Sequence, residues 1–257
     1  MGTKIERMQP VGATASRFAG KIAQLKAASG QIGATCQRDG YEADPDYMDA
    51  IRAYDAGGAG LKSREEERLE SHGIYKRFWT VNAAYIEKRG VPAENAKAWL
   101  AVKTYIKNLD RHIRHGEGLT LVGGVGTMKT TMAIAVLREL VDRRQVGYFI
   151  PMVSLLDNLN QMRERRDGSL IQLENRIRTT PLLVLDDLGA EYDHTWVQCK
   201  VDAIIAERYN RMRATIVTSN LAAEDIRDRY QVRIYDRLRA TNKIITFKGD
   251  SKRESWG

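Results

Sequence analysis

The sequence predicts an α/β fold built on a five-stranded parallel sheet. From about residue 73 onward, short apolar runs of strand length alternate with segments long enough to form crossover helices. Strands that alternate with helices form parallel sheets buried on both faces, and one of the strands leads into a glycine-rich loop and a helix. The expected strands are 119–122, 146–150, 182–185, 216–218 and 244–247.

The composition limits the class of protein. The chain has 257 residues, with 41 Lys and Arg against 33 Asp and Glu, a formal net charge of +8 that is compatible with a nucleic-acid partner. Its two cysteines are too few for a disulfide framework and fit a reducing compartment, so we expect a cytoplasmic protein. We expect no membrane contact, because no stretch approaches the roughly 20 apolar residues that span a bilayer.

The N-terminal part differs from the rest in its charge pattern. Residues 1–40 hold six basic and two acidic residues, and residues 41–60 hold one basic and five acidic. Apolar residues at helical spacing in both stretches predict short helices, and the glycine-rich run 56–60 predicts a flexible linker. We therefore expect a small helical module at 1–70 and the α/β domain at 71–257.

A glycine-rich loop between a strand and a helix is the strongest motif. Glycines let backbone N–H groups surround phosphates, and the helix N-terminus adds its dipole. We expect Lys129 to reach the β- and γ-phosphates of ATP, the Thr130 hydroxyl to bind Mg²⁺, and Thr131 to belong to the same nucleotide site. Aligned with the phosphate-loop motif G-x-x-x-x-G-K-S/T, the residues are Gly123, Gly124, Val125, Gly126, Thr127, Met128, Lys129 and Thr130.

Met128 departs from this motif, which has glycine at that position. A side chain there is expected to clash or to force a disfavoured backbone dihedral. We expect nucleotide still to bind, with lower affinity. The alternative is a glycine-rich turn that binds nothing.

Two further polar groups follow strands. Asp186 and Asp187 come directly after the run 182–185, at the carboxyl end where α/β folds bind ligands. We expect Asp186 to hold Mg²⁺ and Asp187 to polarise the attacking water. Asn220, after the run 216–218, would orient that water. The alternatives are a capped turn for the two acids and an ordinary helix cap for Asn220.

Together these three elements resemble the AAA+ ATPases. The sequence DDLGAE at 186–191, followed by ERYN at 207–210 and TIVTSNL at 215–221, is similar to the DnaC/DnaI-type bacterial replicative helicase loaders and their phage-encoded relatives. The segment 73–78 is similar to the lead-in to their ATPase domain. The rival resemblance is to IstB-type transposition helper ATPases.

The resemblance implies that the ATP site is completed by a neighbouring subunit in a ring or spiral. Arg233, with Arg237 second, matches the region of the arginine finger, and Arg253 matches the sensor-two position. The alternative is that these arginines belong to a solvated face or contact a phosphate backbone. The chain after residue 247 is too short for a full helical lid, so we expect none.

The resemblance also implies a contact with single-stranded DNA. The family's contact helix would be residues 154–166, which end in three arginines, Arg163, Arg165 and Arg166. Such residues would follow the phosphate backbone. The alternative is a packed amphipathic helix with a solvated end.

The function that the resemblance implies is ATP-dependent loading of a replicative, hexameric DNA helicase onto single-stranded DNA during replication initiation. ATP and Mg²⁺ are the expected cofactors. We expect residues 1–70 to bind the helicase, and we expect the protein to act in the bacterial cytoplasm or in a phage-infected host. The alternatives are a transposition helper that assembles on duplex DNA, and an adaptor that binds nucleotide without hydrolysing it.

Overall fold

The computed structural model describes residues 63–164, 168–190, 195–230 and 232–251. The chain divides into two compact units, Met1–Glu65 and Glu66–Gly257, and the description below concerns the second. The expected linker at 56–60 and nearly all of the expected N-terminal module lie outside the described residues. The assignment of residues 1–70 to a separate partner-binding module therefore stays a prediction.

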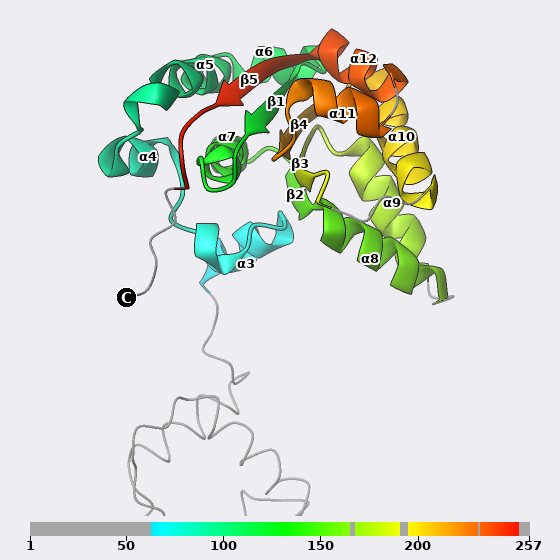
Figure 1. The fold of residues 1–257 in the computed structure, drawn as a ribbon. Helices are drawn as coiled ribbons and strands as arrows, with labels where there is room; N and C mark the ends of the chain where they lie inside the picture. Colours follow the sequence, from blue (N-terminus) through cyan, green and yellow to red (C-terminus); the bar gives the residue numbers. More distant parts are fainter. Residues whose placement is uncertain (1–62, 165–167, 191–194, 231, 252–257) are drawn as a thin grey trace, which may run out of the picture. The chain divides into compact units, whose positions relative to one another are not determined.

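The parallel sheet is present as the sequence predicts. Its strands pair in parallel in the order β2-β3-β4-β1-β5 (Figure 1), and each overlaps one expected apolar run. The strands are β1 (Gly118–Gly123), β2 (Gly147–Pro151), β3 (Leu182–Leu188), β4 (Ala214–Ser219) and β5 (Asn242–Phe247).

Helices cover both faces of the sheet, because alternate strand residues point to opposite sides and both sets are apolar. Leu182 and Val184 join one core with α3 to α7, whereas Leu183 and Leu185 join the other with α8 to α12. The first layer comprises α3 (Arg64–Ser71), α4 (Ala83–Arg89), α5 (Ala96–Lys107), α6 (Leu109–His115), α7 (Lys129–Asp142) and the 3₁₀ helices η1 (Lys76–Phe78) and η2 (Ala93–Asn95). The second comprises α8 (Met152–Glu164), α9 (Ser169–Thr179), α10 (Thr195–Asn210), α11 (Ala223–Tyr230) and α12 (Val232–Thr241).

Apolar residues at helical spacing from Trp99 to Ile113 are divided between two helices, α5 and α6. Asn108 ends α5 with φ −108° and ψ 24°, and its Nδ2 donates to Thr104 O at 2.9 Å. Trp99, Val102 and Leu109 are nevertheless all buried. The break at Asn108 therefore leaves these apolar residues in the core.

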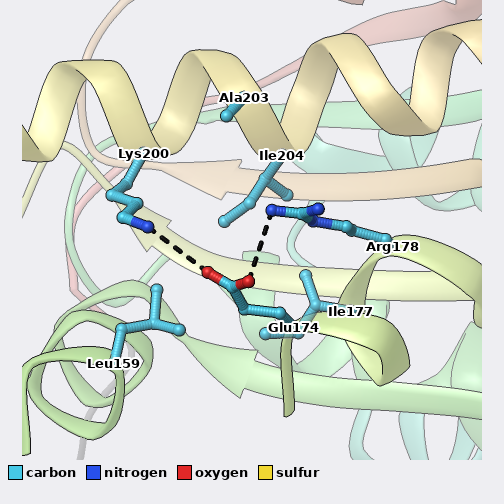
Figure 2. A pocket seen from close by; sticks show the side chains of 7 residues that line it. All are labelled: Leu159, Glu174, Ile177, Arg178, Lys200, Ala203 and Ile204. Carbon is cyan, nitrogen blue, oxygen red and sulfur yellow. Dashed lines mark hydrogen bonds and ion pairs between the residues drawn. The ribbon is translucent and has the colours of Figure 1, made fainter. Parts of the chain in front are cut away.

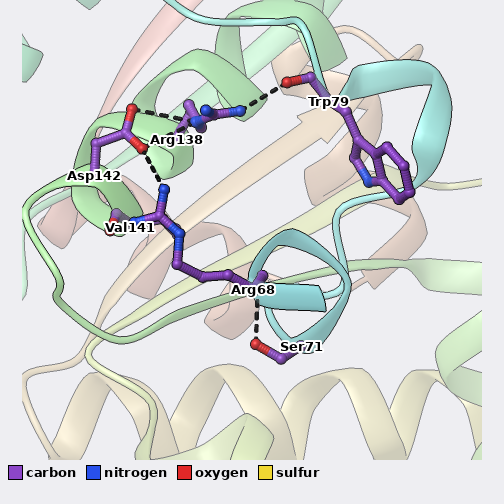
Figure 3. A network of polar contacts seen from close by, with 6 residues as sticks. All are labelled: Arg68, Ser71, Trp79, Arg138, Val141 and Asp142. Atoms are coloured by element: carbon purple, nitrogen blue, oxygen red, sulfur yellow. Dashed lines mark hydrogen bonds and ion pairs between the residues drawn. The ribbon is translucent and has the colours of Figure 1, made fainter. Parts of the chain in front are cut away.

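A polar network fastens the segment before the sheet onto the end of α7, the helix that begins at the glycine-rich loop (Figure 3). Asp142 accepts from Arg68 Nη2 at 3.1 Å and from Arg138 Nε at 3.0 Å. Arg138 Nη1 also donates to Trp79 O at 2.7 Å, and Arg68 Nη1 to Val141 O at 3.2 Å. These bonds position α3 and η1 against α7 on one face of the sheet.

Few described residues follow the last strand. Residues 248–251 come after β5 and contain no helix. None of the helices in the described part of the chain is long and apolar enough to cross a membrane.

Candidate nucleotide-binding site

The glycine-rich loop lies at the carboxyl end of the sheet, between β1 and α7, as the sequence predicts. Gly123 has φ 140° and Gly126 has φ 75°, conformations that favour glycine. Thr127 is buried and its Oγ1 donates to Gly124 O at 2.8 Å, which closes the turn. Val125 is exposed at the loop. The backbone is thus curled in front of the N-terminus of α7, where an anion is stabilised.

Met128 takes the disfavoured backbone conformation that the sequence suggests. It caps α7 with φ 75° and ψ 11°, the left-handed region, in which a side chain costs roughly 1–2 kcal/mol. Its side chain is partly buried and packs on the first-layer core. Met128 therefore brings strain into the loop at the position where the motif has glycine.

Lys129 is folded back over the loop. The residue is 5% exposed, and its Nζ donates to Gly123 O at 2.8 Å, Gly124 O at 2.7 Å and Asn220 Oδ1 at 2.8 Å. These partners are neutral oxygens, which a phosphate can replace at the ammonium group. Thr131, two residues on, is partly buried in the first turn of α7.

Asp186 is a buried carboxylate that accepts two hydroxyl donors. Its Oδ1 receives Thr130 Oγ1 at 2.8 Å and Thr218 Oγ1 at 2.7 Å. Burial raises the pKa of Asp186, and the hydrogen bond from Thr218 opposes that rise. The carboxylate and the Thr130 hydroxyl are hard oxygen ligands of the kind that suits Mg²⁺. The described residues contain no group of three or more His, Cys, Asp or Glu side chains that could hold a metal ion, so the remaining Mg²⁺ ligands would be phosphate and water.

Asp187 is turned out of the strand by a bulge. The β3–β4 register shifts between Leu185 and Leu188, and Asp187 has φ 57°. Asn220 Nδ2 lies 3.4 Å from Asp187 Oδ1, and Asn220 Oδ1 meets Lys129, so Asn220 joins the acid to the loop lysine. Bulges that re-aim a side chain are frequent next to active sites.

Thr218 is a site residue that the sequence reasoning missed. It is fully buried in β4, donates to Asp186 Oδ1, and accepts the Asp187 N–H at 2.9 Å. It therefore fixes both acids from the neighbouring strand. The available signal was a threonine beside Ser219 at the end of an otherwise apolar run.

Arg233 and Arg237 are not brought to this cluster. In the described part of the chain they lie on α12 and pair with Asp202 of α10, at 3.3 Å from Arg233 Nε and 2.7 Å from Arg237 Nη1. A role for either arginine at a neighbour's nucleotide stays a prediction.

The other arginines of interest are not described. Arg165, Arg166 and Arg253 lie outside the described residues, as does the side chain of Arg163 at the end of α8. The apolar face of α8 is buried in the second-layer core, through Leu155, Leu156 and Leu159 among others. The packed amphipathic helix is thus present, and DNA contact at its end stays a prediction.

A small pocket between α8, α9 and α10 is separate from the phosphate loop (Figure 2). Glu174 lies in it, paired with Lys200 at 3.3 Å and Arg178 at 3.5 Å. Its cavity volume of about 10 Å³ is room for about one water molecule, so it is no nucleotide pocket. The lining residues are Leu159, Glu174, Ile177, Arg178, Lys200, Ala203 and Ile204.

The class of protein follows from this architecture. A phosphate loop after β1, two acids in the carboxyl-terminal part of β3 and an asparagine after β4 define a P-loop NTPase of the AAA+ class. The family model described as IstB-like ATP binding protein matches residues 100–255, and the chain belongs to this family.

Relatives within this class are helicase loaders. The chain is 28% identical over 116 residues to the replicative helicase loader DnaI of Bacillus subtilis (strain 168), covering 45% of this chain and 37% of DnaI. It is 26% identical over 155 residues to the replicative helicase loader DnaC of Escherichia coli (strain K12), covering 59% of this chain and 61% of DnaC. A crystal structure of the DnaC helicase loader superposes with a TM-score of 0.60 at 26% identity, covering 68% of this chain and 100% of that one.

The match spans less than two thirds of the length of either curated relative. The resemblance to AAA+ proteins and to helicase loaders that the motifs predict is confirmed. The activity and the partners of the whole protein are taken up as a proposal.

Proposed function

We propose that this protein is an Mg²⁺-dependent ATPase that loads a replicative DNA helicase onto single-stranded DNA in the bacterial cytoplasm. The observation that carries the proposal is the bonded cluster of Lys129, Asn220 and Asp187 beside Thr130 and Asp186. The similarity to two curated helicase loaders supports the loading role.

The chemistry assigned to each residue follows from its position. An entering triphosphate displaces the loop carbonyls from Lys129, whose ammonium then binds the β- and γ-phosphates. Asp187 and Asn220, held together, orient the attacking water, and Asp187 polarises it. Thr130 and Asp186 would hold Mg²⁺, which supplies positive charge against the phosphate oxygens.

Hydrolysis in this proposal depends on self-association into a ring or spiral. Arg233 or Arg237 of one subunit stabilises charge on the γ-phosphate bound by its neighbour. Both arginines share Asp202 in the isolated chain, so one carboxylate meets two guanidinium groups. The excess positive charge on α12 is available to an anion on a neighbouring subunit.

The test of the loading role is co-purification of the full chain with the host's replicative helicase, with and without ATP. We expect a complex whose stability changes with ATP, and we expect Lys129→Met to remove the ATP effect. Absence of a complex in both conditions contradicts the loading role. It would leave nucleotide binding to be judged by its own measurement.

The DNA contact has its own test. Replacing Arg163, Arg165 and Arg166 by Ala is expected to weaken binding to single-stranded oligonucleotides and to reduce its salt dependence. Unchanged affinity for single-stranded DNA in the triple variant rules this assignment out.

A second candidate is a transposition helper, because the family model matched is IstB-like. It would assemble on duplex DNA and recruit a transposase, so a preference for duplex over single-stranded DNA favours it. A third candidate, an adaptor that does not hydrolyse ATP, is favoured by the left-handed Met128 in the loop. Absence of ATP turnover with both DNA and helicase present would select that candidate.

A further inference from the structure

The segment that follows β5 runs beside the phosphate loop. The β1–β5 pairing ends with Gly123 opposite Phe247, and both segments continue past the sheet in the same direction. A side-chain carbon added to Gly126 would lie 2.1 Å from Ser251 Oγ, so Ser251 packs directly against that glycine. Residues 248–251, which we call the strap, therefore follow the loop beyond the end of the sheet.

One buried side chain holds the start of the strap. Asn95, at the end of η2, is 1% exposed. Its Nδ2 donates to Lys248 O at 2.9 Å, and its Oδ1 accepts the Lys248 N–H at 2.8 Å. The amide thus pairs with the strap backbone as a neighbouring strand would, through one N–H donor and its oxygen.

The strap also packs between η2 and the loop. Gly249 has φ +91°, and a carbon added to it would lie 2.5 Å from Glu94 Oε1 on one side. On the other side, a carbon added to Gly124 would lie 3.8 Å from Gly249 O. The strap therefore fills the space between Glu94 and the glycines of the loop.

We propose that Asn95 is a positioning residue for the phosphates of the nucleotide, acting through the strap. The inference rests on the proposed nucleotide-binding function. The loop is rich in glycine, whose backbone has the widest freedom, and its N–H groups bind phosphate only in one curled arrangement. A strap fixed by Asn95 keeps the loop in that arrangement before the ligand arrives, which reduces the ordering required on binding.

The test is Asn95→Asp in the full chain. Aspartate has nearly the same size and can still accept the Lys248 N–H, but it places an acceptor against Lys248 O. We expect the Kd values for fluorescent mant-ATP and mant-ADP both to rise about tenfold, because the loop binds phosphates common to the two. We also expect faster hydrogen exchange at loop amides 123–127 in the nucleotide-free protein.

The matched control is Asn108→Asp, the same change at an asparagine that donates to Thr104 O in its own helix. We expect this control to leave both Kd values unchanged. If Asn95 serves only the stability of the fold, Asn95→Asp lowers the unfolding temperature but leaves Kd and hydrogen exchange in the loop of the folded protein unchanged. That result overturns the inference.

A second variant keeps the test decisive if Asn95→Asp does not fold. Gly249→Ala changes an exposed residue at φ +91° and adds a carbon that overlaps Glu94, so the strap has to shift and we expect the same direction of change in Kd. If the wild-type protein binds mant-ATP and the folded strap variants bind it equally well, the role of Asn95 is refuted. The proposed nucleotide-binding function is not affected by that result. Wild-type protein that binds neither analogue overturns the proposed nucleotide-binding function and this inference together.

Discussion

The two ends of the parallel sheet differ in how their buried polar groups are hydrogen-bonded. At the amino end, Arg208 is 1% exposed and satisfied by fixed backbone and hydroxyl oxygens. Its guanidinium donates to Ile177 O at 2.6 Å, Thr180 O at 3.0 Å, Ala214 O at 2.6 Å and Thr215 Oγ1 at 2.8 Å. Burial lowers the pKa of Arg208 to about 9, so the group remains charged at neutral pH.

At the carboxyl end, the polar groups are bonded to one another and the backbone is strained. Met128 and Asp187 both have positive φ, and burial raises the pKa of Asp186. Lys129 is held by the loop's own carbonyls. The amino end also has two left-handed residues, Arg144 and Met212, so strained backbone is not confined to one end. The difference lies in the polar contacts: the amino end fixes its buried charge for stability, whereas the carboxyl end holds its charged groups through contacts that a ligand can replace.

The largest expected effect is on stability, at the amino end. Arg208→Met removes four hydrogen bonds and leaves buried acceptors without a donor, which should lower the free energy of unfolding by about 4 kcal/mol. Urea unfolding measures it. Arg211→Met is the control, because the Arg211 side chain is 52% exposed and pairs only with Glu207 among the contacts described. This control should change the free energy of unfolding by about 0.5 kcal/mol. Equal losses in the two variants would contradict the structural role of Arg208.

The next effect is on ligand binding, at the carboxyl end. Lys129→Met should weaken ATP binding by about 10²-fold, because the site loses the charge that meets the phosphates. Isothermal titration of ATP measures it. Lys103→Met, at an exposed lysine paired with Glu87, should leave the affinity unchanged. ATP affinity that survives Lys129→Met would mean that the loop is only a turn.

Substitution of Asp186 should raise the stability of the protein and lower its ATP turnover. Its pKa is raised in the folded state, so the folded chain holds this proton more tightly than the unfolded chain and its stability falls as the pH rises above the ordinary carboxyl range. Asp186→Asn removes that loss, keeps an acceptor for Thr130 and Thr218, and should stabilise the nucleotide-free protein at pH 7 by about 1 kcal/mol.

The measurement is thermal unfolding of both proteins across pH, with Mg²⁺-dependent ATP turnover beside it. The stabilisation should shrink toward acid pH, where wild-type Asp186 is also neutral, and turnover should fall sharply. A variant that is less stable than wild type at pH 7 would contradict a destabilising buried charge.

Sequence reasoning succeeded where the signal was local. Each of the five strands was predictable from an apolar run, and the phosphate loop from the spacing of Gly123 to Lys129. The left-handed backbone of Met128 was predictable too, because the motif has glycine there.

It failed where a contact joins residues far apart in the chain. Asn95 and Lys248 are separated by 153 positions, and neither belongs to a motif. The bond from Thr218 to Asp186 depends on the pairing of β3 with β4, which no single strand encodes. The pairing of Arg233 and Arg237 with Asp202 likewise appears only once α10 and α12 are packed.

The smallest expected effect concerns the strain itself. Met128→Gly should raise ATP affinity by about fivefold, because relief of roughly 1 kcal/mol of left-handed strain lets the loop adopt the geometry that phosphate requires. Met212→Gly is the control, since Met212 has φ 49° at the amino end, beside Gly116. Both changes should alter stability by less than about 1 kcal/mol, because strain relief is offset by the greater freedom of glycine in the unfolded chain. Only the change at Met128 should alter ATP affinity or turnover. If it alters neither, strain at the carboxyl end does not attenuate the site, and the contrast between the two ends lies in charge alone.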